Sequence, residues 1–314
     1  MSLEHMHQAL VEGAKADELA SSATSAEEFF YAAMVAHRCG DVLSAAELSA
    51  RAAALEPRHG VYQEVERHLR SGKPAADVYA EPEAFTAFAQ GGGNVGLYQA
   101  THQALRSQYA AHRPGRLLDI GSGEGHGLLP SLTADVGHVD SIEPSAQRLG
   151  LVTAELSRRG VPHRGHPVTV QEFTATCSTE HWDLVQETFA LLAVDRQERR
   201  ELLRWLRPRT DRLAFAEFDV PALGEGLAPQ WFRYLTSRYD RGIREYDGAD
   251  RSVVAQGFLI PVLLGMLGSQ EHQRHHEQPI SRWVEDLRDA GFAPLPPQYL
   301  FDYWWAPAFL LVAE

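Results

Sequence analysis

The most informative stretch of the sequence for the fold class is RLLDIGSGEGHGLLPSL, from Arg116 to Leu132. It begins with a short apolar run, continues through Gly121, Gly123 and Gly125, and passes directly into residues that favour a helix. Glycine lets the chain leave a strand sharply and lets a ligand approach the backbone without a Cβ in the way. The pattern therefore predicts a buried strand, a ligand-binding turn and a helix, which together begin an α/β sheet.

A second strand is predicted to end in Ile-Glu-Pro-Ser, at residues 142–145. The carboxylate of Glu143 would then lie where it can accept both hydrogen bonds from a ribose diol. A dinucleotide-binding turn has the spacing GxGxxG, whereas this turn is GxGxG and continues with His126. Asp119 and Glu124 would repel a pyrophosphate and attract an amino group. The turn therefore favours a nucleoside joined to an amino acid.

The combination of LLDIGSGEG with a following strand that ends in IEPS resembles the class I S-adenosylmethionine-dependent methyltransferases. The resemblance covers about residues 91–314. It implies an α/β fold with a seven-stranded Rossmann-like methyltransferase sheet and S-adenosyl-L-methionine as the cofactor. It also implies how the cofactor is held: Gly121, Gly123 and Gly125 under its methionine part, Asp119 at its amino group and Glu143 at its ribose.

The resemblance also draws attention to the ends of the third and fourth strands. The family usually places an acid and an apolar residue against adenine after the third strand, and here Gln171, Glu172 and Phe173 are the candidates. This departure from the family pattern leaves the adenine contact open. After the fourth strand, where the family lines the methyl-transfer site, the chain has Gln-Glu-Thr-Phe at residues 186–189. The Asn/Asp-Pro-Pro-Tyr signature of amino methylation of nucleobases and glutamine is absent there, which argues against those acceptors.

An acceptor atom that carries a proton needs a base. Glu187 is the first candidate, because strand ends at the carboxyl edge of a parallel sheet surround the ligand crevice. A solvated position, or one beside the ribose, is the alternative for Glu187, and Glu217 and Asp219 carry the same ambiguity. Tyr98 and His272 are the other candidate catalytic residues. The histidine run around His272 lacks a matching acidic ligand set, so no metal ion is expected.

Another glycine-rich segment, residues 88–98, precedes the predicted turn. Three successive glycines, at residues 91–93, cost backbone entropy unless the backbone must approach something closely. The segment resembles one found in some actinobacterial small-molecule methyltransferases, including ones that methylate indole-type rings, in which it covers the cofactor. This resemblance makes Gly92, Asn94 and Tyr79 candidate cofactor-binding residues. The alternative is a flexible hinge beside two core tyrosines.

The predicted strands are runs rich in Leu, Ile, Val and Phe that alternate with helical stretches. Such alternation indicates a parallel sheet with helices on both faces. The predicted strands are Arg116–Ile120, His138–Ile142, Pro167–Gln171, Trp182–Gln186 and Arg212–Glu217, followed by a closing hairpin of Tyr299–Trp304 and Phe309–Ala313.

Two regions fall outside this alternation. Residues 1–72 are rich in Ala, Glu, Leu and Arg, which favours an all-helical extension to the methyltransferase domain at 73–314. A helix, a turn at Gly40 and a second helix that ends before Pro57 resemble one tetratricopeptide repeat, and an ordinary helical hairpin is the alternative. Within the second domain, about residues 222–279 are expected to form a helical lid.

Charge and composition limit the partners. The chain has 29 Lys and Arg against 42 Asp and Glu, a formal charge of −13 that would repel phosphodiester backbones and anionic lipid. The apolar run from Gly257 to Leu267 is too short to cross a bilayer, and the N-terminus has no apolar export segment. Two cysteines, Cys39 and Cys177, give no disulfide framework or zinc-site spacing. We therefore expect a cytoplasmic protein without nucleic-acid or membrane partners.

These patterns predict methyl transfer from S-adenosylmethionine to a small molecule, expected to be a partly aromatic metabolite of natural product biosynthesis. Whether carbon, nitrogen or oxygen is methylated stays open. The alternatives are an NAD(P)-dependent oxidoreductase and a non-catalytic scaffold that binds S-adenosylmethionine and presents the N-terminal helices. A homodimer through those helices or through the lid is also compatible with the sequence.

Overall fold

The computed structural model of the chain describes residues 2–72, 82–177, 179–268 and 276–314. The contacts among residues divide the chain into two compact units. Unit 1 comprises Met1–Val95 and Leu223–Gln273, and unit 2 comprises Gly96–Ala222 and Arg274–Glu314.

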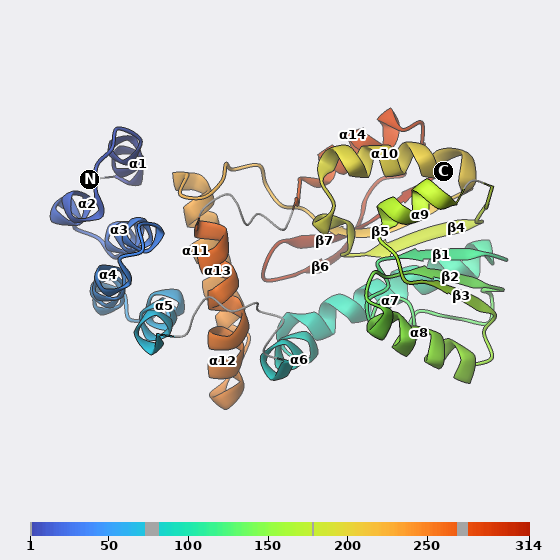
Figure 1. The fold of residues 1–314 in the computed structure, drawn as a ribbon, viewed down its shortest axis with the longest axis horizontal. Helices are drawn as coiled ribbons and strands as arrows, with labels where there is room; N and C mark the ends of the chain where they lie inside the picture. Colours follow the sequence, from blue (N-terminus) through green and yellow to red (C-terminus); the bar gives the residue numbers. More distant parts are fainter. Residues whose placement is uncertain (1, 73–81, 178, 269–275) are drawn as a thin grey trace. The chain divides into compact units, whose positions relative to one another are not determined.

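Unit 2 is built on a seven-stranded sheet with the order β3-β2-β1-β4-β5-β7-β6 (Figure 1). Strands β1 to β5 run parallel, and β7 lies antiparallel between β5 and β6. The predicted seven-stranded α/β sheet with a closing hairpin is confirmed. The chain winds outward from β1 in both directions, and ligand crevices open at such a switch point, beyond the carboxyl ends of the strands. The strands are β1 (Leu117–Ile120), β2 (Val139–Ile142), β3 (His163–His166), β4 (Leu184–Thr188), β5 (Leu213–Phe218), β6 (Gln298–Asp302) and β7 (Pro307–Ala313).

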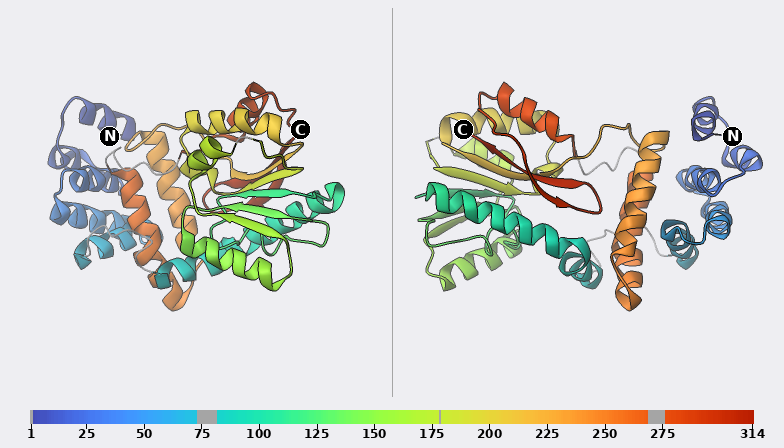
Figure 2. Two further views of the ribbon diagram at one scale, coloured as in Figure 1. Left: turned by 45° about the vertical axis from the view of Figure 1, so that its right-hand side comes forward. Right: turned by 180° about the vertical axis from the view of Figure 1, so that it is seen from behind.

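Helices cover both faces of the sheet (Figures 1 and 2). Side chains alternate along a strand, so Leu117 and Leu118 of β1 enter different cores. Leu118 packs with side chains of α9, α10 and α14, and Leu117 packs with side chains of α7 and α8. The helical elements are α7 (Gly92–His112), α8 (Ala146–Arg158), α9 (Val170–Thr176), α10 (Arg196–Leu206), α14 (Ile280–Asp289) and the short turns η2 (Leu191–Ala193) and η3 (Arg207–Arg209).

The third strand differs from its prediction. Residues 167–171 were predicted to form it, but β3 ends at His166 and α9 begins at Val170. Thr169 explains the difference, because its hydroxyl accepts from the N–H of Glu172 while the Glu172 carboxylate accepts from the N–H and hydroxyl of Thr169. This reciprocal capping box starts a helix. The true strand lies at the edge of the sheet and has the sequence His-Arg-Gly-His, without an apolar run to reveal it.

The described part of unit 1 consists of helices and the turns between them (Figure 1). A helical hairpin forms where the sequence predicts one, with a left-handed turn at Gly40 (φ 79°). The small side chains of Ala45 and Ala52 are fully buried in it. Its likeness to a tetratricopeptide repeat stays a prediction. The helices are α1 (Leu3–Val11), α2 (Ala16–Ser22), α3 (Ala26–Arg38), α4 (Val42–Leu55), α5 (Gly60–Ser71), α6 (Pro82–Gln90), α11 (Pro229–Arg244), α12 (Gly248–Val254), the π-helical turn η4 (Ala255–Leu259) and α13 (Ile260–Leu267).

The insertion after β5 belongs to unit 1 by its contacts. The buried carboxylate of Asp240 in α11 accepts from the N–H of Gly60 at 2.6 Å. The Tyr31 hydroxyl donates to the carbonyl of Leu227 at 3.1 Å. The division of the chain therefore differs from the predicted boundary between residues 72 and 73, because the insertion finds its partners among the N-terminal helices. Its role as a lid stays a prediction.

The helical stretch from Gly248 to Leu267 is long and apolar enough to cross a membrane, judged by length and composition alone. Core helices of soluble proteins pass the same test. Of the most apolar window of this stretch, 44% is buried inside the protein. Elements η4 and α13 of this stretch pack against α5, and α12 packs against α6. The absence of a membrane partner stays a prediction.

Replacing Thr169 with Ala should lower the free energy of unfolding by about 1 kcal/mol, because the N–H of Glu172 loses its capping acceptor. Urea denaturation followed by circular dichroism would measure it. Thr174→Ala is the matched control in the same helix, since that hydroxyl donates to the carbonyl of Gln171 without capping an end. Equal losses in the two variants would contradict the capping role.

Candidate functional site

The turn after β1, residues 121–125, is called the glycine loop below. The φ angles of Gly121, Gly123 and Gly125 are 69°, 52° and 83°, in the left-handed region that strains other residues. A Cβ on Gly121 would lie 2.4 Å from the Cβ of Ala190, and one on Gly125 would lie 2.6 Å from Leu129. A Cβ on Gly123 would meet no atom within 4 Å. Gly121 and Gly125 thus allow close packing, whereas Gly123 leaves its backbone open to a ligand.

Glu143 follows β2 and braces the glycine loop. Its Oε2 accepts from the N–H of Gly123 at 3.0 Å, and its Oε1 accepts from the N–H of Ser145 at 3.0 Å. A carboxylate offers about four acceptor positions, so each oxygen of Glu143 retains capacity for a further donor. One side chain therefore fixes the loop and also presents two acceptors beside it, as a ribose diol requires.

Asp119 lies in β1, buried just before the glycine loop. Its Oδ1 accepts from Nε2 of Gln186 at 2.9 Å, and the hydroxyl of Tyr109 donates to the carbonyl oxygen of Gln186. Oδ2 of Asp119 has no donor among the described residues. Burial, together with the charge of Glu143, raises the pKa of Asp119 to about 6. A buried acceptor that lacks a donor fits the amino group of a ligand, whose charge would favour the ionised carboxylate.

The segment that follows β4 packs against the glycine loop. Ala190 is the residue that a Cβ on Gly121 would meet, and a Cβ on Gly127 would lie 2.5 Å from Oγ1 of Thr188. Between them, Phe189 has a φ of 52°. For a bulky residue this conformation costs on the order of 1 to 3 kcal/mol, and it persists where the surroundings impose it, often at functional sites.

Glu187, the first candidate base, lies beneath this segment and is fully buried. Its Oε2 accepts from the N–H of Ala190 at 2.9 Å and of Leu191 at 3.3 Å. Its Oε1 has no donor in the part of the chain that the structure describes. Burial raises the pKa of Glu187 to about 8, and the charge of Asp119 adds to the effect. In this conformation Glu187 holds backbone, and its action as a base stays a prediction.

Further buried ionisable groups surround Glu187. Glu217 of β5 is its neighbour on the adjacent strand, and burial followed by the charge of Glu187 raises the pKa of Glu217 well above the usual value. Glu277 accepts from Nε1 of Trp305 at 2.8 Å, and burial raises the pKa of Glu277 to about 7. The positive charge of Arg199 in α10 acts against this rise in pKa at both Glu217 and Glu277. Three carboxyl groups, of which those of Glu187 and Glu217 are fully buried, therefore lie near one guanidinium at this edge of the sheet.

Aromatic rings line the same edge. Phe189 stacks on Phe218, with ring centroids 4.4 Å apart, and Phe218 stacks on Tyr303 at 5.4 Å. Tyr98 meets Phe189 edge-on at 6.2 Å. Burial raises the pKa of Tyr98, so its hydroxyl stays protonated at neutral pH. These four residues are called the aromatic row below, and the base role predicted for Tyr98 stays a prediction.

The candidate adenine residues belong to α9. The carboxylate of Glu172 forms the capping box, and Phe173 is buried in the core. The ring of Phe173 meets the ring of His166 edge-on at 4.8 Å and packs against Trp182 at 6.0 Å. The structure thus gives both side chains a local role, and their contact with adenine stays a prediction.

The second glycine-rich segment finds a partner inside unit 1. A Cβ on Gly92 would lie 2.9 Å from the ring of Tyr246, and Nδ2 of Asn94 donates to the carbonyl of Phe88 at 2.8 Å. The close approach that the sequence demands is therefore made to Tyr246. The predicted cofactor contacts of Gly92 and Asn94 stay predictions, and Tyr79 and His272 lie outside the described residues.

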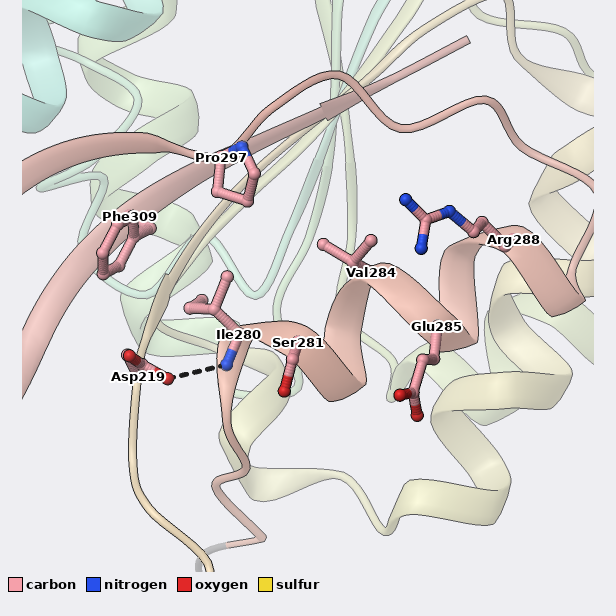
Figure 3. Close-up of a pocket in the computed structure, with 8 residues that line it drawn as sticks. All are labelled: Asp219, Ile280, Ser281, Val284, Glu285, Arg288, Pro297 and Phe309. Atoms are coloured by element: carbon pink, nitrogen blue, oxygen red, sulfur yellow. Dashed lines mark hydrogen bonds between the residues drawn. The ribbon is translucent and has the colours of Figure 1, made fainter.

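Asp219, just after β5, caps a helix. Its Oδ1 accepts from the N–H of Ile280 at 2.8 Å, at the first turn of α14 (Figure 3). A pocket of about 570 Å³ opens beside this bond. Its lining residues come from α14, β7 and the neighbouring turns, and none belongs to the glycine loop, so the pocket is separate from the candidate site. The lining residues are Asp219, Ile280, Ser281, Val284, Glu285, Arg288, Pro297 and Phe309.

One group of potential metal ligands occurs among the described residues. Ligand atoms of His181, Asp183 and Asp211 lie within 4.8 Å of one another. Asp183 precedes β4, so this group lies at the amino end of the strand, whereas the glycine loop and Glu143 lie at the carboxyl edge. Asp183 also accepts from the N–H of Arg116. The group thus supplies nothing to the candidate site.

No protein-family model matches the chain, and no curated protein matches it. Several solved structures are similar at low identity. The magnesium protoporphyrin IX methyltransferase of Synechocystis PCC 6803 with bound SAM is 14% identical, with a TM-score of 0.45 over 80% of this chain and 89% of that chain. The 1,6-didemethyltoxoflavin-N1-methyltransferase of Burkholderia thailandensis is 17% identical, with a TM-score of 0.44 over 68% and 77%. The plantazolicin methyltransferase is 10% identical, with a TM-score of 0.47 over 76% and 93%. Likenesses at these values are too weak to transfer a function.

Gly121→Ala should destabilise unit 2 by about 2 to 4 kcal/mol, because the new methyl group adds left-handed strain to a clash with Ala190. Denaturant unfolding of the full chain, followed by tryptophan fluorescence, would measure the loss. Gly150→Ala is the control, since that glycine lies inside α8 with open space around it and alanine favours a helix. A Gly121→Ala protein as stable as the native chain would show that the loop does not pack as described.

Proposed function

We propose that unit 2 transfers the methyl group of S-adenosylmethionine to a small-molecule acceptor. The observation that carries the proposal is the glycine loop with its two acids. Gly123 leaves its backbone open, Glu143 offers two acceptors beside it, and Asp119 has a buried oxygen without a donor. These groups would bind the methionine backbone, the ribose diol and the amino group of the cofactor. Asp119 and Glu124 would disfavour the pyrophosphate of a dinucleotide beside this loop.

Bound S-adenosylmethionine supplies a methyl group on a positively charged sulfur. Its transfer to a nucleophile needs in-line placement and a dry site, and no covalent attachment to the enzyme. The residues of this chain would contribute by fixing the donor and excluding water. The segment Thr188–Ala190 packs on the glycine loop and would form one wall of the site, with the half-buried ring of Phe189 at its centre.

For the acceptor we propose a partly aromatic metabolite, as in natural product tailoring. The aromatic row supports this choice, because Phe189 lies next to the glycine loop and its ring stacks on Phe218. The backbone of Phe189 is held in a strained left-handed conformation. Planar rings stack favourably on such a surface, with about 0.5 to 1.5 kcal/mol beyond the gain from buried area. A lid role for the insertion between residues 222 and 279 remains part of the proposal.

The cofactor is tested by thermal denaturation with S-adenosylhomocysteine or NADH, because a ligand that binds only the folded state raises the melting temperature. We expect stabilisation by S-adenosylhomocysteine alone. Glu143→Ala should weaken its affinity by about 1 to 3 kcal/mol, measured by calorimetry, through loss of charged hydrogen bonds.

Glu155→Ala is the matched control, since Glu155 pairs with Arg158 on the outer side of α8. Glu143→Gln retains the shape of the side chain and removes its charge, so it serves as a second variant if Glu143→Ala fails to fold. Stabilisation by NADH alone would support the oxidoreductase. Binding of S-adenosylhomocysteine without methylation of any acceptor in an extract would support the non-catalytic scaffold.

The acceptor surface is tested with 2-naphthol and its saturated analogue decahydro-2-naphthol, each titrated into the complex with S-adenosylhomocysteine. We expect 2-naphthol to bind more tightly, and Phe189→Leu to weaken its binding about three- to tenfold through the loss of ring stacking. Tyr299→Leu removes an exposed ring outside the aromatic row and should leave binding unchanged. Equal affinity for the two alcohols would contradict an aromatic acceptor surface.

A further inference from the structure

Glu187 and Glu217 occupy neighbouring strands beneath the candidate site. The parallel register pairs Glu187 of β4 with Phe215 of β5, and Glu217 lies two residues further along. Because side chains alternate along a strand, Glu187 and Glu217 point to the same face of the sheet. Both side chains are buried, with 0% and 1% of their surface exposed. Two carboxyl groups are thus brought together where water cannot solvate them.

The hydrogen bonds of this pair are incomplete if both groups are ionised. Oε2 of Glu187 accepts from Ala190 and Leu191, but Oε1 of Glu187 and Oε1 of Glu217 have no donor within the described residues. A buried acceptor without a donor costs about 1 to 3 kcal/mol, and two adjacent negative charges repel each other. One proton between the two groups would supply the missing donor and remove one of the charges.

The charges that the described residues place around the pair are more negative than positive. Asp119 of β1 and Glu277, which precedes α14, add negative charge from two sides. Arg199 of α10 adds positive charge, and it acts on Glu277 as well as on Glu217. Burial raises the pKa of Glu187 to about 8 and raises that of Glu217 well above its usual value, in agreement with a shared proton.

We propose that Glu187 and Glu217 share one proton and, through it, hold the segment Thr188–Leu191 in the shape that the methyl donor requires. Both are then positioning residues, and the inference rests on the proposed function. The N–H groups that Glu187 holds belong to the two residues directly after the strained Phe189, and the first of them, Ala190, packs on Gly121. No other acceptor for these two N–H groups is recorded in the described structure.

Loss of the proton to solvent leaves two charges side by side in apolar surroundings. They separate only if a carboxylate moves, and the carboxylate of Glu187 carries the N–H groups of Ala190 and Leu191 with it. The segment would then leave the glycine loop. If only the protonated form binds the donor, the apparent dissociation constant rises as the fraction of that form falls, about tenfold for each pH unit above the apparent pKa of the pair.

The test measures S-adenosylhomocysteine affinity by calorimetry from about pH 6 to about pH 9.5 for the native chain, Glu187→Gln and Glu217→Gln. A Gln at either position imitates the protonated carboxyl group, since its amide donates to the remaining partner. We expect the affinity of the native chain to fall at alkaline pH and the fall to be abolished in both variants. The amino group of the ligand titrates equally in every protein, so the difference between variants isolates the pair.

Infrared spectroscopy at neutral pH gives a second readout that does not depend on ligand. The native chain should show the carbonyl stretch of a protonated carboxylic acid, and each Gln variant should lose intensity in that band. Glu277, whose pKa is raised to about 7, contributes to the band in every variant, so the difference between proteins reports the pair. Glu201→Gln is the matched control, because Glu201 is exposed on α10 and bonded to Gln197. It should keep both the carbonyl band and the native pH profile.

A native pH profile that persists in both Gln variants would overturn the positioning role, and so would a carbonyl band of equal intensity in the native chain and both variants. If S-adenosylhomocysteine binds at no pH, the proposed function fails and the positioning role fails with it. The infrared band would still report whether the two carboxyl groups share a proton. The two failures are therefore distinguishable.

Discussion

The hydrogen bond from the N–H of Gly123 to the carboxylate of Glu143 is the constraint on which the candidate site depends. It joins the turn after β1 to the end of β2 and braces a turn in which every second residue, Gly121, Gly123 and Gly125, is a left-handed glycine. The same turn meets the end of β4 at Ala190, so the carboxyl ends of three strands are fixed relative to one another. Below them, Glu187 ties the segment after β4 to the sheet. The site is thus a set of strand ends held by two carboxyl groups, that of Glu143 beside the glycine loop and that of Glu187 fully buried.

The sequence was sufficient to predict the parts of this arrangement that have a local signature. The glycine loop and Glu143 were predicted because a sharp turn and a strand-end acid leave short, recognisable patterns. The third strand was placed wrongly, because β3 has no apolar run. Most of the residues predicted to form it belong instead to the start of α9, which Thr169 caps. Arg199 and Glu277 were not among the predicted site residues, for a different reason. Their contacts with the carboxyl groups of β4 and β5 join parts of the chain far apart in sequence, and no short pattern encodes such contacts.

The glycines of this chain have different surroundings, which the sequence alone does not distinguish. In the glycine loop, Gly121 is crowded by a neighbouring side chain while Gly123 faces open space, although both have left-handed backbones. Gly92 was predicted to contact a cofactor, which stays a prediction, and the structure places the ring of Tyr246 where a side chain on Gly91 or Gly92 would lie. A sequence shows that the backbone must come close to something. Only the structure shows whether that partner is protein, and at Gly123 no protein atom lies within 4 Å of the position that a Cβ would take.

Unit 1 is discontinuous in the chain, and this affects how it can be made. The ring of Phe232 in α11 packs against Phe30 and Tyr31 of α3, and Asp240 satisfies the first N–H of α5. During translation, the N-terminal helices therefore leave the ribosome well before these partners do, since all of β1 to β5 must be synthesised in between. An expression fragment cut at residue 95 would present that apolar surface to water. Such a fragment is poorly suited to studying the helices by themselves, because their partners in unit 1 include residues 223–273.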